Sequence, residues 1–382
     1  MKIVYYLPSL YISGGLERII TLKANYFAEH FDDYEVVILT SEQCGKEPYY
    51  KLSEKIKHID IDVPFDFPLN QSKLEKLIKY PFKYGLFKKR FTQKIYELAP
   101  DVVISTLRRE LNFITKLKDK SVKIGELHIS RYFYHSHSIQ NNNQIIKALK
   151  NYWDSIFLAN LKKLDKVVVL TNEEAAYWPE LSNCMVINNF LTFYPEENSP
   201  CTSNEVIAVG RYSHQKGFDM LINAWEIVAK RNPDWILKIY GEGNREDLNN
   251  LIIKYKISDS CFLKHPTSDI ANRYLESSIY VLSSRFEGMP MVLLEAIASG
   301  LPVVSFDCPC GPKDIINHEV DGILVKSGNI EELADKICYL IENENIRKEM
   351  GLEARKNAER FKIEHISLLW KNLFEELTKN KN

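Results

Sequence analysis

The chain has 382 residues, enough for two domains of about 150 to 200 residues each. Its formal net charge of −1 gives the whole molecule no bias toward nucleic acid or anionic lipid, so any basic patch must be local. Seven cysteines without a C-x-x-C pair argue against a zinc or thioredoxin-like centre.

The N-terminus turns from a short apolar run into Pro, Ser and Gly, which is too short for a signal sequence or a membrane span. Together with the odd cysteine count, this predicts a protein of the reducing cytoplasm.

The first half of the chain alternates short apolar runs with helical segments. We expect strands at 2–7 and 34–40, with a helix at 16–30 between them. Further runs that are apolar on both faces and β-branched lie at 101–105, 122–127 and 166–170. Such runs are typical of parallel strands covered by helices on both sides, and the alternation predicts a doubly wound α/β domain over 1–187.

A basic and aromatic segment lies at 73–94, where eight Lys or Arg residues accompany one acid, Glu75. One interpretation is a patch that binds anionic lipid, to which each basic residue adds about 1 kcal/mol. The other is a solvated helix face whose apolar residues belong to the core. Nucleic acid is not favoured, because no RNP-type or helix-turn-helix pattern occurs.

The second half begins after 188–204, a stretch rich in Asn, Pro and Ser that predicts a linker. Strands are expected at 206–210, 236–240, 261–263, 279–283 and 302–306. Helices are expected at 217–231, 245–256, 268–276, 290–299 and 331–342. They predict a second α/β domain over 205–362, followed at 363–382 by an amphipathic helix that crosses back to the first domain. Two such domains would form a cleft at the carboxyl ends of their strands.

Glycine loops follow several predicted strands. Gly14 and Gly15 lie between a strand and a helix, where backbone N–H groups can contact a phosphate, although a plain tight turn would look the same. The G-x-G-x-x-G fingerprint is absent, so a nicotinamide site is not favoured. Gly241 and Gly243 bring another loop near the cleft or simply connect a strand to a helix.

Arg211 and Lys216 lie five residues apart after the strand that ends at Gly210. They could clamp a diphosphate, the arginine through its bidentate fork and the lysine as a point charge. The plainer interpretation is that both are solvated loop residues.

Two glutamates, Glu287 and Glu295, surround a Gly-Met-Pro turn. Glu295 lies in an apolar run, where an unpaired carboxylate is costly, so it needs a partner such as the hydroxyls of a ribose. Pro290 suits the first helical turn, and helical spacing would then keep the two glutamates near one face. Free backbone N–H groups are expected at Gly288, Met289 and Met291. Without a ligand, the pair would be a capping glutamate and a salt-bridged one.

Together these residues resemble the retaining glycosyltransferases of family 4, which have the GT-B fold of two Rossmann-like domains. The specific match is E-x7-E, from Glu287 to Glu295, in the context S-x-F-E-G-x-P-x-x-x-x-E-A-x-A-x-G-x-P-V. V-G-R-x-x-x-x-K-G at 209–217 and G-G-x-E at 14–17 also match. The resemblance covers essentially the whole chain and is to members that build bacterial cell-surface glycans.

The resemblance implies roles for single residues. Arg211 and Lys216 would bind the donor diphosphate and stabilise the leaving charge without a metal ion. Glu287 would contact sugar hydroxyls, and Glu295 would hold the ribose. His128, just past a strand end, would join the catalytic set in preference to His135 and His137. Further contacts to donor or acceptor would come from Gly14, Gly15, Gly241, Gly288, Met289, Met291, His265 and Pro266.

The implied reaction moves a sugar from a nucleotide donor, expected to be a UDP-linked hexose or N-acetylhexosamine, to a glycan or polyprenyl-diphosphate-linked acceptor. It retains the anomeric configuration and needs no cofactor or metal beyond the nucleotide sugar. The enzyme would act in the cytoplasm, held at the inner face of the cytoplasmic membrane through 73–94, in lipopolysaccharide or capsule synthesis. The alternatives are a non-catalytic nucleotide-sugar-binding protein and a nucleotide-sugar epimerase on the same fold.

Overall fold

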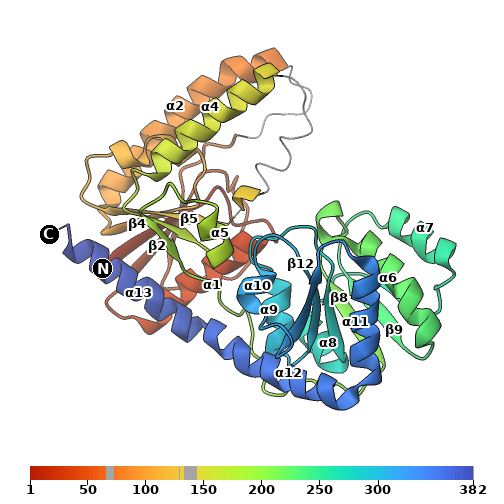
Figure 1. The fold of residues 1–382 in the computed structure, drawn as a ribbon. Coiled ribbons are helices and arrows are strands. Elements are labelled where there is room, and N and C mark those ends of the chain that lie inside the picture. Colours follow the sequence, from red (N-terminus) through yellow and green to blue (C-terminus); the bar gives the residue numbers. More distant parts are fainter. Residues whose placement is uncertain (66–72, 129, 133–143, 382) are drawn as a thin grey trace. The chain divides into compact units, whose positions relative to one another are not determined.

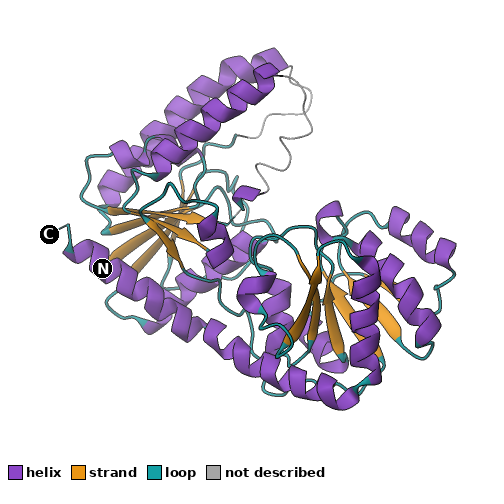
Figure 2. Ribbon diagram, viewed as in Figure 1, coloured by secondary structure: helices purple, strands orange, loops and turns teal. Residues whose placement is uncertain are grey.

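The computed structural model describes residues 1–65, 73–128, 130–132 and 144–381. The chain divides into two compact units, each a parallel sheet flanked by helices (Figures 1 and 2). Unit 1 comprises Met1–Leu170, Ala175–Ile187 and Ile363–Asn382, and unit 2 comprises Thr171–Glu174 and Asn188–Lys362.

Unit 1 is built on a seven-stranded sheet with the order β3-β2-β1-β4-β5-β6-β7. Its strands are β1 (Lys2–Tyr6), β2 (Glu35–Thr40), β3 (Lys57–Asp60), β4 (Val102–Ser105), β5 (Val122–Leu127), β6 (Lys166–Val169) and β7 (Cys184–Val186). Val4 lies opposite both Val37 and Val103, and all three side chains are fully buried. The strand order reverses between β1 and β4, so the carboxyl ends of these strands flank the switch point at which such sheets bind ligands.

The main helices of unit 1 are α1 (Gly15–His30), α2 (Lys73–Leu98), α4 (Gln144–Leu161) and α13 (Ile363–Lys379). The C-terminal helix α13 packs on α1, where the rings of Phe374 and Phe27 lie 5.5 Å apart. This contact places the last helix of the chain in the core of unit 1.

Unit 2 is built on a six-stranded parallel sheet with the order β10-β9-β8-β11-β12-β13. Its strands are β8 (Glu205–Val209), β9 (Ile236–Tyr240), β10 (Cys261–Lys264), β11 (Ile279–Leu282), β12 (Val303–Asp307) and β13 (Gly322–Lys326). Its helices are α6 (Phe218–Arg231), α7 (Glu246–Tyr255), α8 (Ile270–Glu276), α9 (Met291–Ala298), α10 (Pro312–Ile315), α11 (Ile330–Glu342) and α12 (Glu344–Ala358). The order reverses between β8 and β11, which sets the switch point of this sheet.

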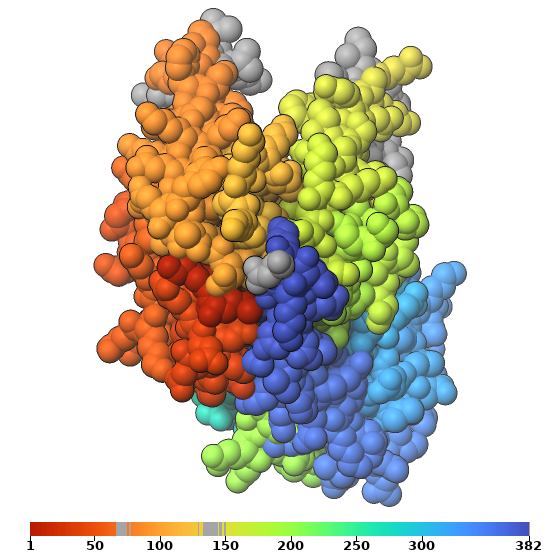
Figure 3. All heavy atoms as spheres, turned by 90° about the vertical axis from the view of Figure 1, so that its left-hand side faces the viewer, coloured from red at the N-terminus to blue at the C-terminus, as the bar shows by residue number. Residues whose placement is uncertain are grey.

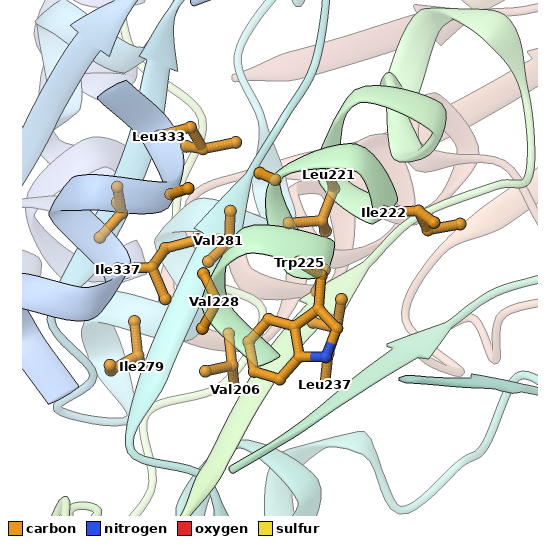
Figure 4. Packing of buried hydrophobic residues seen from close by; sticks show 14 of the residues in the cluster. Val206, Leu221, Ile222, Trp225, Val228, Leu237, Ile279, Val281, Leu333 and Ile337 are labelled. Atoms are coloured by element: carbon orange, nitrogen blue, oxygen red, sulfur yellow. The ribbon is translucent and has the colours of Figure 1, made fainter. Parts of the chain in front are cut away.

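The core of unit 2 forms where α6 and α11 cover the sheet. Figure 4 shows Trp225 of α6 over Val206 and Leu237, all fully buried. The buried indole keeps its polar group satisfied, because Nε1 donates to Ser260 Oγ at 3.2 Å. The predicted α/β class with two Rossmann-like sheets is therefore confirmed.

Candidate functional site

In unit 2, the loops that follow β8 and β11 leave neighbouring strands at the switch point. Lys216 on the first loop lies 2.8 Å from the Oε1 atom of Glu287 on the second. The same oxygen accepts a hydrogen bond from the Ser284 hydroxyl at 2.5 Å, and the carboxylate is buried. Two residues that the sequence marked separately are thus brought into contact at this edge of the sheet.

Close backbone packing fixes the two loops against each other. Gly217 has φ +63, and a Cβ atom there would lie 2.0 Å from the carbonyl oxygen of Ser283, so only glycine fits. Arg285 adds a two-pronged ion pair, because its two Nη atoms donate to the carboxylate oxygens of Asp219 at 2.8 and 2.6 Å. The loop conformation is therefore held before any ligand binds.

Arg211, in contrast, is exposed, and its guanidinium makes no hydrogen bond or ion pair with any residue that the structure describes. The fold thus provides one lysine paired with a carboxylate and, five residues before it, an arginine whose charge is uncompensated. This is a pair of cations suited to an anionic ligand at a strand end.

The turn before α9 also presents hydrogen-bond donors. The N–H of Glu287 donates to the carbonyl oxygen of Pro309 at 3.0 Å. Within the described ranges, the backbone N–H groups with no acceptor include those of Gly288, Met289 and Met291. They lie at or just before the N-terminus of α9, where the helix dipole favours an anion.

One spacing argument was wrong. Helix α9 begins at Met291 with Pro290 as its N-cap, so Glu287 lies four residues before the helix and shares no helical face with Glu295. Proline has no N–H and ends the turn rather than continuing the helix backward.

Glu295 is buried in α9, and its carboxylate accepts hydrogen bonds from two hydroxyl groups. Thr192 donates to Oε1 at 2.7 Å and Tyr274 to Oε2 at 3.3 Å. The sequence gave no signal for these partners, which lie far from Glu295 in the chain. Any ribose at this carboxylate would share it with Thr192 and Tyr274.

The remaining predicted residues of unit 2 lie on loops after β9 and β10. A Cβ atom on Gly241 would lie 1.9 Å from the carbonyl oxygen of Gly210, so close packing between loops already requires this glycine. His265 and Pro266 are both exposed, and Nη2 of Arg245 lies 2.7 Å from Nε2 of His265. Arg245 is a neighbour that the sequence analysis missed.

In unit 1, the predicted Gly14-Gly15 loop forms the start of α1. A Cβ atom on Gly14 would lie 1.9 Å from Oε2 of Glu17, whereas one on Gly15 would meet nothing within 4 Å. The Glu17 carboxylate therefore lies at the helix N-terminus, where it interacts favourably with the dipole. An anion would compete with it there, while Gly15 stays open to a neutral group.

His128 lies at the end of β5 beside a buried ion pair. Its Nε2 atom is 3.2 Å from Oε1 of Glu126, and both oxygens of Glu126 lie 2.6 Å from Nζ of Lys23. The lysine also lies 3.9 Å from the ring centroid of Trp370 on α13. Burial raises the pKa of Glu126, but Lys23 and His128 outweigh it and bring the pKa down to about 2. The other two candidates, His135 and His137, lie outside the described residues.

Lys23 and Glu126 could have been found from the sequence. Lys23 lies on the apolar face of α1 with Ile19, Ile20 and Phe27, and Glu126 interrupts an otherwise buried strand. A lysine and a carboxylate in such places need each other.

The segment 73–94 forms most of α2, and its aromatic residues divide between core and surface. Phe87 and Phe91 are fully buried, but Phe82 is 77% exposed. Two of its cations serve the structure, because Lys83 and Arg90 donate to backbone carbonyl groups of the loop before α2. Among the described residues, no helix combines the length and apolar character needed to span a membrane.

Two Rossmann-like sheets, each with its ligand loops at a switch point, define the class of GT-B enzymes. Residues 192–357 match the family described as glycosyl transferases group 1. An uncharacterized glycosyltransferase of Haemophilus influenzae is 31% identical over 97% of this chain and 99% of its own length. The amylovoran biosynthesis glycosyltransferase AmsD of Erwinia amylovora is 28% identical over 97% and 99%. The chain belongs to the group 1 glycosyltransferases and is a transferase enzyme.

Solved structures agree on the fold. Sucrose-phosphate synthase from Thermosynechococcus elongatus has a TM-score of 0.80 at 18% identity, covering 99% of both chains. TarM of S. aureus, in complex with fondaparinux, α-GlcNAc-glycerol and UDP, has a TM-score of 0.74 at 19% identity, covering 98% and 99%.

Proposed function

We propose that the protein is a retaining glycosyltransferase of cell-surface polysaccharide synthesis. It moves a hexose or N-acetylhexosamine from UDP to a glycan or polyprenyl-diphosphate-linked acceptor. The observation that carries this proposal is the Lys216–Glu287 pair at the switch point of unit 2, with the uncompensated Arg211 on the same loop.

The donor base is proposed from similar proteins. UDP is bound in the solved structures of TarM and of the pneumococcal O-GlcNAc transferase GtfA. The acceptor class follows from relatives named for amylovoran biosynthesis and for poly(ribitol-phosphate) N-acetylglucosaminyl transfer. Each of these names describes the relative, and our proposal extends the common chemistry to this chain.

In the proposed mechanism, Arg211 and Lys216 neutralise the diphosphate as the nucleotide leaves, which replaces a metal ion. Glu287, which already holds Lys216, also accepts hydroxyls of the sugar. Glu295 holds the ribose together with its hydroxyl partners. Donor amides come from residues 288–291, and Gly241, His265 and Pro266 lie toward the nucleotide.

Unit 1 contributes the acceptor side. His128 contacts the reacting sugar, and Gly14 and Gly15 approach the acceptor or the phosphates. Exposed Phe82 and the basic residues around it hold the enzyme at the inner face of the cytoplasmic membrane. Retention proceeds by front-face attack, because no carboxylate nucleophile of the glycosidase kind stands out in the sequence.

The first test is thermal unfolding of the purified protein with UDP, GDP, ADP or CMP, without added metal. At about 100 times Kd, a bound ligand adds roughly 2.7 kcal/mol, which raises the Tm by about two degrees or more. We expect a shift with UDP alone. Arg211→Ala should abolish it, whereas Lys230→Ala, which removes an exposed cation of the same unit, should not.

A transfer assay with UDP-sugars then decides between the functions. A glycan product with the donor's anomeric configuration supports the proposal, and trapping of a covalent glycosyl-enzyme would overturn front-face attack. Binding without turnover identifies a nucleotide-sugar-binding protein. Conversion of one UDP-sugar into another, with no glycan product, identifies an epimerase.

A further inference from the structure

Two cavities of unit 1 meet at one residue. The first, of about 550 Å³, lies at the switch point, and its walls include Ser9 after β1, Glu42 after β2 and Glu17 of α1. The second, of about 280 Å³, is mainly apolar and is lined by Leu111, Phe157, Trp153 and Trp178 among others. Arg108 and Asn112 line both cavities. Figure 3 shows the surface of unit 1 hollowed between α2, in orange, and α4, in yellow-green.

The turn that carries Arg108 is strained and heavily supported. Leu107, just before it, has φ +58, a left-handed conformation that costs free energy for a leucine. The Leu107 N–H donates to Ser105 Oγ, and the Ser105 hydroxyl donates to the fully buried Glu110 at 2.5 Å. The Arg108 N–H donates to the same carboxylate oxygen at 3.0 Å. Such strain persists where the surrounding structure imposes it, and it concentrates at ligand sites.

The charges of neighbouring residues are already paired, but that of Arg108 is not. Arg109 lies 2.7 Å from Glu42, and its guanidinium stacks 3.8 Å from the ring centroid of Phe65. Arg131, in the wall of the apolar cavity, pairs with Glu180 at 2.8 Å. The exposed guanidinium of Arg108 makes no hydrogen bond or ion pair in the described part of the chain.

The two cavities suit different parts of one molecule. Carboxylates of Glu17 and Glu42 in the larger cavity repel an anion and accept hydrogen bonds from hydroxyl groups. Trp153 and Trp178 in the smaller cavity suit an apolar group. Arg108 stands where they meet and attracts a phosphate.

We propose that these cavities form one acceptor site for an amphiphilic phosphate, in which Arg108 binds the phosphate, the larger cavity takes the sugar end and the smaller cavity takes the apolar chain. This rests on the proposed function, and it names the acceptor class for it: a sugar joined through phosphate to an apolar carrier.

The test is a binding experiment that needs no nucleotide sugar. Decyl phosphate, below its micelle concentration, is titrated into the full chain carrying ¹⁵N-labelled tryptophan. The neutral probe is decyl glucoside. Trp153→Phe and Trp178→Phe assign the indole signals of the cavity, and the other three tryptophans of the chain serve as internal controls.

We expect saturable shifts of the two cavity indoles and none of the other three. Arg108→Gln should weaken decyl phosphate binding at least tenfold and leave decyl glucoside unchanged. Lys120→Gln, which removes an exposed cation of unit 1 outside both cavities, should change neither.

Equal affinity of Arg108→Gln for decyl phosphate, or shifts that miss Trp153 and Trp178, would overturn the site. A failed transfer assay with intact Arg108-dependent binding would instead count against the transferase proposal alone.

Discussion

Replacement of Lys23 should destabilise unit 1 more than any surface change. Lys23 and Glu126 are almost completely buried, with side-chain exposures of 1% and 2%. Lys23→Met leaves the Glu126 carboxylate in the interior with only His128 near it. Removal of one partner of a buried pair costs about 3–5 kcal/mol. For a unit of roughly 200 residues, at about 2–4 °C per kcal/mol, the Tm should fall by about 6–20 °C.

The assay is thermal unfolding of three variants beside the wild type. Lys23→Met and Glu126→Gln should each lose several kcal/mol, whereas Lys23→Met/Glu126→Leu should lose far less than their sum, because no charge is left unpaired. Single-variant losses below about 1 kcal/mol, or additive losses in the double variant, would refute the reasoning.

The same pair predicts a pH dependence with a definite sign. The pKa of Glu126 is lowered from its ordinary 4.5 to about 2 in the folded protein. Its contribution, roughly 3 kcal/mol, is therefore present above pH 4.5 and is lost as the pH falls toward 2. The stability difference between wild type and Glu126→Gln should shrink between pH 6 and pH 3, and a difference that stays constant would contradict the assignment.

Three further predictions concern other parts of the chain. Gly241→Ala should lower the Tm even without ligand, because its Cβ would lie 1.9 Å from the Gly210 carbonyl oxygen; an unchanged Tm would mean that the loop moves freely. In the native protein, Cys44 should react with Ellman's reagent well before the other thiols, since it is exposed while burial raises the pKa of Cys261 to about 12 and that of Cys308 well above its usual range. Seven fast thiols would refute this. Transfer activity should survive EDTA within about twofold, because Arg211 and Lys216 supply the charge; loss of activity that Mg²⁺ restores would disprove metal independence.

Much of the fold followed from strands that are apolar on both faces. β1, β4 and β5 lie within a residue or so of their predicted bounds, because central parallel strands must be buried on both sides. β3 and β7 were missed. Both are short strands at the edges of their sheet, and β3 (KHID) is half exposed and polar, so no apolar run marks it. Helix α12 was missed because charged residues surround its small buried stripe.

The site was predictable where it depends on strand ends and not where it depends on distant contacts. Lys216 and Glu287 follow adjacent parallel strands, so the pattern alone brings their loops to the same edge. Thr192, the partner of Glu295, lies 103 positions away in the chain, and no local pattern connects the two. The turn at Pro290 also separates Glu287 from the helix that spacing alone had assigned to it.

The position of α13 sets the order in which the chain can mature during translation. Unit 2 is almost continuous in sequence, so it can complete its core as soon as residue 362 is available. Unit 1 is begun first, yet the side of α1 that carries Lys23 and Phe27 stays uncovered until Trp370 and Phe374 have been synthesised. The ribosome therefore starts unit 1 early and lets it close only after unit 2 has been made.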